Sequence, residues 1–154
     1  MKNKRKIIIA ALIFGLFVAF PVAAQKTKSD FQKMYMDFLK KKNMNSSVTA
    51  DGDISFVIGR NGYYILLNEN FPKEFQLFTF ITLEGVQLQK SLLAASQVNM
   101  SIYGAKIAIS NDGKTAGVFV EMLVLKPKDF QQLFDLMVAM IDEAAGEFVS
   151  LVFE

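Results

Sequence analysis

Residues Val48–Leu67, VTADGDISFVIGRNGYYILL, carry the clearest indication of the architecture in this 154-residue chain. Two dipeptides in this stretch, Asp51-Gly52 and Asn61-Gly62, favour tight hairpin turns, because Asn, Asp and Gly tolerate the positive φ that such turns need. The strands expected beside these turns are Val48–Ala50, Asp53–Ile58 and Tyr63–Leu67. Hairpin turns connect antiparallel neighbours, so we expect an antiparallel sheet.

The rest of the chain alternates between helical and strand spacing of its apolar residues. We expect helices over 29–42, 83–98 and 127–146, the first capped by Ser29 and the last started by Pro127. Further strands are expected at Phe75–Ile81, Lys106–Ile109 and Thr115–Leu125, with a third hairpin turn at 111–113. The order α-β-β-β-β-α-β-β-α predicts an α+β fold, with an antiparallel sheet of about five to six strands and helices packed on one face.

The end of the last helix has two interpretations. Gly146 offers a stop, because glycine commonly follows the final helical residue. Phe148, Leu151 and Val152 instead extend the helical spacing toward the C-terminus. The sequence leaves open whether residues 147–154 are helix or strand.

The first 24 residues have the pattern of an export signal. Four basic residues at the start precede the apolar run Ile7–Phe20, and Pro21 ends that run. Val22-Ala23-Ala24 then provides the small side chains that a signal peptidase requires. We therefore expect cleavage between Ala24 and Gln25.

Cleavage at that bond divides the chain into a signal peptide (1–24), a flexible leader (25–28) and a single α+β domain (29–154). The mature domain is then expected in the periplasm or secreted, with membrane contact only through the signal segment before cleavage. A retained membrane anchor is the alternative. The fourteen apolar residues of the run form roughly 21 Å of helix, shorter than the ~30 Å hydrocarbon core, which favours cleavage. A lipoprotein would need a cysteine, and the chain has none.

Charge argues against a nucleic-acid partner. The chain has 17 Lys+Arg and 15 Asp+Glu, and the four charges in residues 1–24 are all basic, so the mature part holds 13 basic and 15 acidic side chains. A slightly acidic domain lacks the basic surface of a nucleic-acid binder. The cationic run Lys40-Lys41-Lys42 stands at the expected end of the first helix, where it complements the helix dipole.

Two missing residue types restrict the chemistry. The chain contains no histidine and no cysteine, which removes Ser-His-Asp and Cys-His nucleophilic schemes and most zinc sites. We therefore expect no enzyme activity, no metal site and no cofactor. An enzyme that uses only carboxylates, lysine or tyrosine remains an alternative, although no spacing in the chain favours it.

The remaining charged motifs have structural interpretations. Asp51 and Asp53 resemble the start of a calcium loop, but the further oxygen ligands and the distal Glu of an EF-hand are missing, so we interpret them as turn residues. Asp112 beside Gly113 has the same interpretation. Lys106 is expected at a strand edge, where lysine discourages pairing with another chain.

The layout resembles the YbjN-like family of bacterial regulators proposed to act in sensory transduction, whose fold is shared with type III secretion chaperones. The matching features span Ser29–Ala145. They are the aromatic first helix Phe31–Leu39, the turn Asp51-Gly52-Asp53-Ile54, Asn99 near the end of the second helix, Lys106-Ile107 opening the next strand, and the last helix Phe130–Ala144. The resemblance implies a helical layer on a curved antiparallel sheet, a frequent dimeric state and a role in binding proteins. Secretion chaperones act in the cytoplasm, whereas this chain carries an export signal.

Three residues are candidates for a partner surface. One side chain of the pair Tyr63-Tyr64 must point outward from the sheet, and an outward tyrosine such as Tyr64 is a suitable contact anchor. Leu136 and Val138 lie off the main apolar stripe of the last helix, so they become exposed if that stripe is buried. We therefore predict an exported non-catalytic domain that binds another protein or forms a homodimer. The alternative is a periplasmic carrier that holds a small apolar ligand between the sheet and the Phe- and Met-rich helices.

Overall fold

The computed structural model describes residues 28–68, 74–123 and 126–153. The helices within this part are α2 (Lys28–Lys41), α3 (Leu88–Ser101) and α4 (Phe130–Phe153), and the 3₁₀ turn Pro127–Asp129 leads into α4. The strands are β1 (Ser46–Val48), β2 (Ile54–Ile58), β3 (Asn61–Leu66), β4 (Glu74–Thr82), β5 (Ala105–Ile109) and β6 (Thr115–Leu123). The predicted signal peptide, the Ala24–Gln25 cleavage site and the predicted leader up to residue 27 lie outside the described residues.

The strands form one six-stranded sheet in the order β1-β2-β3-β4-β6-β5. Every pairing in it is antiparallel. The chain leaves β4, runs through α3 and enters the sheet again at its far edge as β5, and the β5–β6 hairpin then places β6 beside β4. The predicted α+β class, element order and antiparallel sheet are confirmed.

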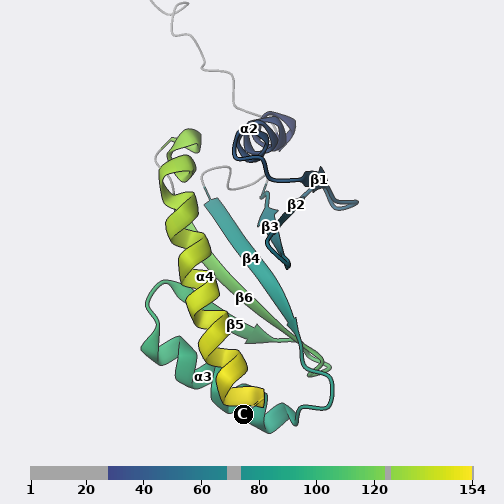
Figure 1. Ribbon diagram of the computed structural model, residues 1–154, viewed down its shortest axis with the longest axis vertical. Helices are drawn as coiled ribbons and strands as arrows, with labels where there is room; N and C mark the ends of the chain where they lie inside the picture. Colours follow the sequence, from purple (N-terminus) through teal and green to yellow (C-terminus); the bar gives the residue numbers. More distant parts are fainter. Residues whose placement is uncertain (1–27, 69–73, 124–125, 154) are drawn as a thin grey trace, which may run out of the picture.

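The helices cover one face of the sheet, as predicted (Figure 1). α2 lies over β1 and β2, α4 crosses β4, β6 and β5, and α3 packs against β5 and α4. Because side chains alternate along a strand, every second residue of the central strands faces the helices; these residues are buried except at the strand ends, where Ile81 and Met122 are half-buried. The largest fully buried aromatic side chains between the layers are Tyr35, Tyr63, Phe75, Phe130, Phe134 and Phe148. These rings form the centre of the core.

The hairpin predicted at Asn61-Gly62 is shifted by two residues. Ile58 pairs with Asn61, so the connecting residues are Gly59 and Arg60, and Gly59 supplies the positive φ of 61°. The physical reason is register, because this turn places Phe56 opposite Tyr63 and Ile54 opposite Ile65 on the buried face. A turn at 61–62 would have placed Ile54 opposite residue 69, a glutamate.

The first helix and first strand also begin earlier than predicted. α2 starts at Lys28, one residue before the expected cap Ser29, and β1 is Ser46–Val48 rather than Val48–Ala50. The connection to β2 uses Thr49, whose N–H donates to the Asp53 carbonyl (2.8 Å) and whose carbonyl accepts from the Gly52 N–H (3.0 Å). Gly52 has a φ of 84°, so the turn predicted at Asp51-Gly52 is present.

The second helix starts later than predicted, at Leu88 instead of residue 83. Leu83 is buried in the core, but its N–H donates to the Lys114 carbonyl at 2.8 Å, which extends the β4 direction beyond the strand. Gly85 then adopts a φ of 77°. A helix cannot pass through that left-handed conformation, so residues 83–87 form a turn.

The last helix does not stop at Gly146 and continues to Phe153, giving 24 residues. Ala144, Phe148 and Val152 follow one another at four-residue spacing and are all buried. A glycine inside a helix costs about 1 kcal/mol relative to alanine. Burial of one phenylalanine contributes about 1.5–3 kcal/mol, which is enough to carry the helix through the glycine.

The free edge of β5 is closed by a side chain from α3. The Asn99 amide donates to the Ile107 carbonyl at 3.0 Å, and its carbonyl oxygen accepts from the Ile107 N–H at 2.7 Å. Lys106, the predicted edge lysine, lies on this outermost strand. Its Nζ donates to the main-chain carbonyl of Asn99 at 3.4 Å. Asn99 therefore takes the place of a neighbouring strand at the middle of the edge.

Candidate binding surface

The sheet face opposite the helices carries a group of aromatic side chains, which we call the aromatic patch. Its members are Tyr64 on β3, Phe78 and Phe80 on β4, and Phe119 on β6. They share a face because Tyr64 pairs with Phe78 and Phe78 pairs with Phe119, so the three lie in one row across the sheet. Residues before and after them on each strand point into the core.

Ring contacts hold the aromatic patch together. The Tyr64 ring stacks on Phe78 with centroids 5.0 Å apart, and Phe80 meets Tyr64 edge-on at 5.6 Å and Phe78 edge-on at 5.0 Å. Such offset and edge-to-face pairs stabilise beyond their buried area. The three rings therefore form a preformed cluster on the strands rather than independent surface groups.

Phe80 lies opposite a glycine on the adjacent strand. Gly117 pairs with Phe80, and a Cβ added at Gly117 would lie 3.8 Å from the Phe80 ring. The Phe80 ring therefore lies beside the side-chain position of residue 117 at ordinary contact distance. Phe80 remains 54% exposed, and Val57 and Leu123 on the same face are 51% and 83% exposed. A face with this much exposed apolar area is typical of an interaction surface.

Polar pairs flank the aromatic patch at both sides. The Gln76 amide donates to the Glu121 carboxylate between β4 and β6, and the Ser47 and Ser55 hydroxyls bond each other at 2.8 Å between β1 and β2. An apolar centre with a polar rim is the usual composition of a protein interface.

The three sequence-predicted partner residues do not lie together. Tyr64 is half-buried within the aromatic patch on the outer sheet face. Leu136 is 54% exposed on α4, which lies on the opposite face of the sheet. Val138 packs against the core and is half-buried rather than exposed. The structure therefore groups Tyr64 with Phe78, Phe80 and Phe119, a set that the strand spacing alone did not assign to the outer face.

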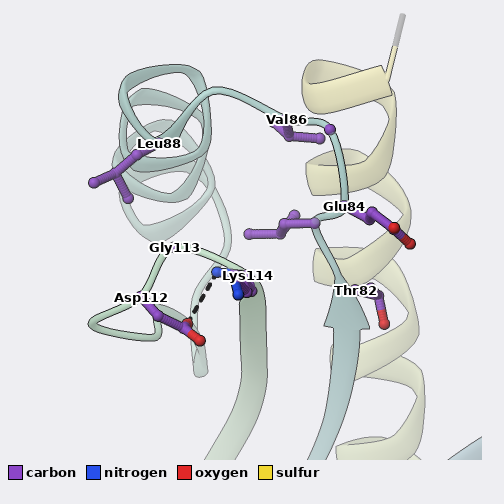
Figure 2. A pocket seen from close by; sticks show the side chains of 9 residues that line it. Thr82, Glu84, Val86, Leu88, Asp112, Gly113 and Lys114 are labelled. Atoms are coloured by element: carbon purple, nitrogen blue, oxygen red, sulfur yellow. Dashed lines mark hydrogen bonds between the residues drawn. The ribbon is translucent and has the colours of Figure 1, made fainter.

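A hollow of about 450 Å³ lies beyond the end of the sheet, where the β4–α3 turn meets the β5–β6 loop. Figure 2 shows that Glu84 and Leu88 point in different directions, while Asp112 turns back onto its own loop. The Asp112 carboxylate accepts from the Ser110 hydroxyl at 2.7 Å and the Lys114 N–H at 3.1 Å, and these bonds hold its pKa below the ordinary value. Asp112 is therefore a turn residue, as predicted, and the charged groups do not converge on a ligand.

The other acidic motif also has a structural role. The Asp53 carboxylate accepts the Leu67 N–H at 3.0 Å and so ties the β1–β2 turn to the end of β3. Across the described ranges, no three acidic, histidine or cysteine side chains are grouped so that they could hold a metal ion. In the same ranges, no helix combines the length and apolar character needed to cross a bilayer.

A second cleft, of about 320 Å³, lies between the β3–β4 strands and the second half of α4. Tyr63 is buried on the helix side of the sheet, and its hydroxyl donates to the Asp142 carboxylate at the cleft. Burial, and then this hydrogen bond, raise the pKa of Tyr63 from 10.0 to about 12. Tyr63 is therefore a neutral hydrogen-bond donor at physiological pH.

Alkaline pH should destabilise the fold through this tyrosine. The folded-state pKa of Tyr63 is raised, so its contribution to stability is complete below pH 10.0 and is lost as the pH rises toward about 12. We expect Tyr63→Phe to lose less of its free energy of unfolding across this interval than the wild type, as measured by urea unfolding at increasing pH. Tyr64→Phe is the matched control. Equal pH dependence in wild type and Tyr63→Phe would contradict the assignment.

Comparisons with known proteins support the fold. No protein-family model matches the sequence, and no curated protein matches it either. Among solved structures, YbjN of E. coli, described as a proposed transcription regulator, has a TM-score of 0.55 and 13% identity, covering 73% of this chain and 86% of its own. The HopA1–SchA chaperone–effector complex contains a chain with a TM-score of 0.53 and 11% identity, covering 80% and 98%.

A third solved structure covers a similar share of the chain. An uncharacterised protein of Methanothermobacter thermautotrophicus has a TM-score of 0.57 and 8% identity, covering 79% of this chain and 95% of its own. At these identities the comparisons establish a shared fold. The resemblance to YbjN-like proteins and secretion chaperones predicted from the sequence is confirmed at that level.

Proposed function

We propose that this protein is an exported, non-catalytic domain that binds another protein, or a second copy of itself, through the aromatic patch. The observation that carries the proposal is an aromatic cluster on a sheet face that the helices leave uncovered, with Phe80 at 54% exposure. Leu123, which is 83% exposed, lies on the same face beyond the Gln76–Glu121 pair. Tyrosine and phenylalanine are enriched at the centres of protein interfaces. One structural neighbour is a chaperone–effector complex, which is consistent with a protein partner.

Export is the second part of the proposal and is supported by the sequence alone. The basic start, the apolar run and the Ala24–Gln25 junction match a cleaved signal. With this signal removed, the domain works in the periplasm or outside the cell. The chain has no cysteine, so in that oxidising setting burial must hold the fold together without disulfides.

The alternative of an apolar-ligand carrier has less support. It requires an enclosed cavity in the middle of the layer between the sheet and the helices, where Phe75, Phe130 and Phe134 are fully buried. The Phe75 and Phe130 rings are 5.3 Å apart, so side chains occupy the middle of this layer. We therefore favour recognition at the outer face of the sheet.

Replacing Phe80 and Leu123 by threonine tests the proposed surface. Threonine is β-branched and therefore suits a strand, and it replaces the two large exposed apolar side chains by a smaller, more polar one, so the fold should persist. We expect the double variant to weaken self-association or capture of an envelope protein by about tenfold or more, the usual effect at interface centres. Light scattering after size-exclusion chromatography measures self-association, and cross-linking in envelope extracts measures capture of an envelope protein.

Tyr103→Ser provides the matched control, because Tyr103 is 92% exposed and lies outside the aromatic patch. This variant should associate like the wild type. A wild type that stays strictly monomeric and captures no envelope protein would contradict the proposal. Recovery of the intact precursor from the cytosol would contradict the export part alone.

A further inference from the structure

The cleft beside α4 combines a carboxylate, a neutral hydroxyl and apolar walls. Asp142 and Gly146 line it from the helix, and Val149 lies one turn further on. These positions are spaced at i, i+4 and i+7, so they share a helix face that borders the buried stripe. Tyr63 and Ile81 line the opposite wall from the sheet. Ile81 is half-buried and Val149 is 39% exposed.

Asp142 has hydrogen-bonding capacity left in this cleft. Its Oδ1 accepts the Tyr63 hydroxyl proton, whereas neither ion pair found in the described residues includes it. An ionised carboxylate offers about four acceptor positions. Tyr63 orients the group, since its hydroxyl comes from a ring that is 1% exposed. Asp142 is exposed, so a donor entering the cleft from solvent would reach a carboxylate that Tyr63 orients.

Gly146 contributes no side chain to the helix wall of the cleft. It lies in the interior of the 24-residue α4, where glycine is disfavoured relative to alanine. A Cβ added at this position would meet no atom within 4 Å, so packing does not require glycine here. A larger side chain would project into the cleft. Gly146 therefore leaves this part of the cleft wall without a side chain.

We propose that this cleft binds an alkylammonium group, with its cationic head on the Asp142 carboxylate and its methylene chain between Ile81 and Val149. The ammonium group has three donors and no acceptor, which suits a carboxylate already oriented by Tyr63. The apolar walls favour a methylene chain over a hydrated inorganic cation. Two sources share this chemistry, a free small amine and the lysine side chain of a polypeptide.

The test uses n-hexylamine and acetyl-lysine amide as probes for these two sources. Each is titrated into the full-length wild type while backbone and methyl NMR signals are recorded. We expect saturable shifts confined to the residues lining the cleft, including the Ile81 and Val149 methyl groups, and no saturation with 1-hexanol, which has the same chain and no charge. Saturation by hexylamine alone indicates a free amine, and saturation by both indicates that a lysine also fits.

Two variants identify the groups responsible. Asp142→Asn should weaken binding by about tenfold or more, because it removes the charge while retaining the shape. Gly146→Leu should block the cleft while the helix is retained. The control Glu143→Gln changes a neighbouring exposed carboxylate that does not line the cleft and should bind like the wild type. Non-saturable shifts, shifts away from the cleft, equal binding of 1-hexanol, or unchanged binding by Asp142→Asn would each overturn the proposal.

Discussion

Phe130→Ala is expected to lower the free energy of unfolding by about 3–5 kcal/mol, the usual cost of removing a fully buried aromatic ring. Phe130 begins α4 and is 0% exposed. Its ring meets Tyr35 at 4.4 Å and Phe38 at 4.9 Å on α2, and Phe75 at 5.3 Å on β4. Removing it leaves a cavity where two helices and the sheet meet.

This loss is a large fraction of the protein's total free energy of unfolding. Domains of this kind are stable by about 5–15 kcal/mol, so the variant is expected to be marginal or unfolded at growth temperature. Urea unfolding followed by circular dichroism measures the change. Phe153→Ala, at the exposed end of the same helix, is the matched control and should change stability by less than about 1 kcal/mol. A similar loss in both variants would contradict the proposed role of Phe130.

Asn99→Ala is expected to cost about 1–3 kcal/mol and to make the protein prone to aggregation. The substitution removes two hydrogen bonds that close the β5 edge at Ile107, and an unpaired peptide group carries a desolvation cost of this size. The exposed edge then offers a template to another chain. We expect concentration-dependent growth in particle size together with a lower unfolding midpoint.

Gln97→Ala tests whether the effect is specific to the edge. Gln97 is an exposed amide on the same helix, so its removal should alter neither solubility nor the unfolding midpoint by much. Asn99→Asp should have an unfolding midpoint and solubility between those of Asn99→Ala and Gln97→Ala. Its carboxylate still accepts the Ile107 N–H, but it has no amide group to donate to the Ile107 carbonyl. An Asn99→Ala protein that stays monomeric and as stable as wild type would show that the edge needs no closure.

Much of the fold follows from local patterns. The apolar spacing within α2 and α4 predicts these helices, because a helix buries one stripe at i, i+3 and i+4. The alternation in β4 and β6 predicts strands for the corresponding reason. Asp51-Gly52 and Asn111-Asp112-Gly113 lie in turns as expected, with Gly52 and Gly113 at positive φ.

The errors occur where a local signal competes with pairing across the sheet. Asn61-Gly62 has the better turn composition, yet the turn is at Gly59-Arg60, because that register buries Phe56 against Tyr63. Leu83 has helical spacing with later residues, yet its N–H bonds to Lys114, which is 31 positions further along the chain. At Gly146, where the sequence left two interpretations open, burial of Phe148 continues the helix.

The candidate sites likewise depend partly on local sequence and partly on contacts between distant segments. Tyr64 is a sequence-level candidate because one of two adjacent tyrosines must face outward, and it lies within the aromatic patch. The patch needs Phe78 and Phe119 in the same row, and this depends on the β4–β6 register. Tyr63 and Asp142 are 79 positions apart, so no local pattern could have indicated the cleft between them.

Residue order alone specified the α+β class, the antiparallel sheet and the absence of histidine and cysteine chemistry, and it carries the prediction of an export signal, because each depends on composition or on spacing within a few residues. The folded chain specified which strand face stays uncovered, how the β5 edge is closed and where Asp142 meets Tyr63. Those features arise from contacts between distant segments, whose relative placement is set by burial of the shared core and is not encoded in any one segment.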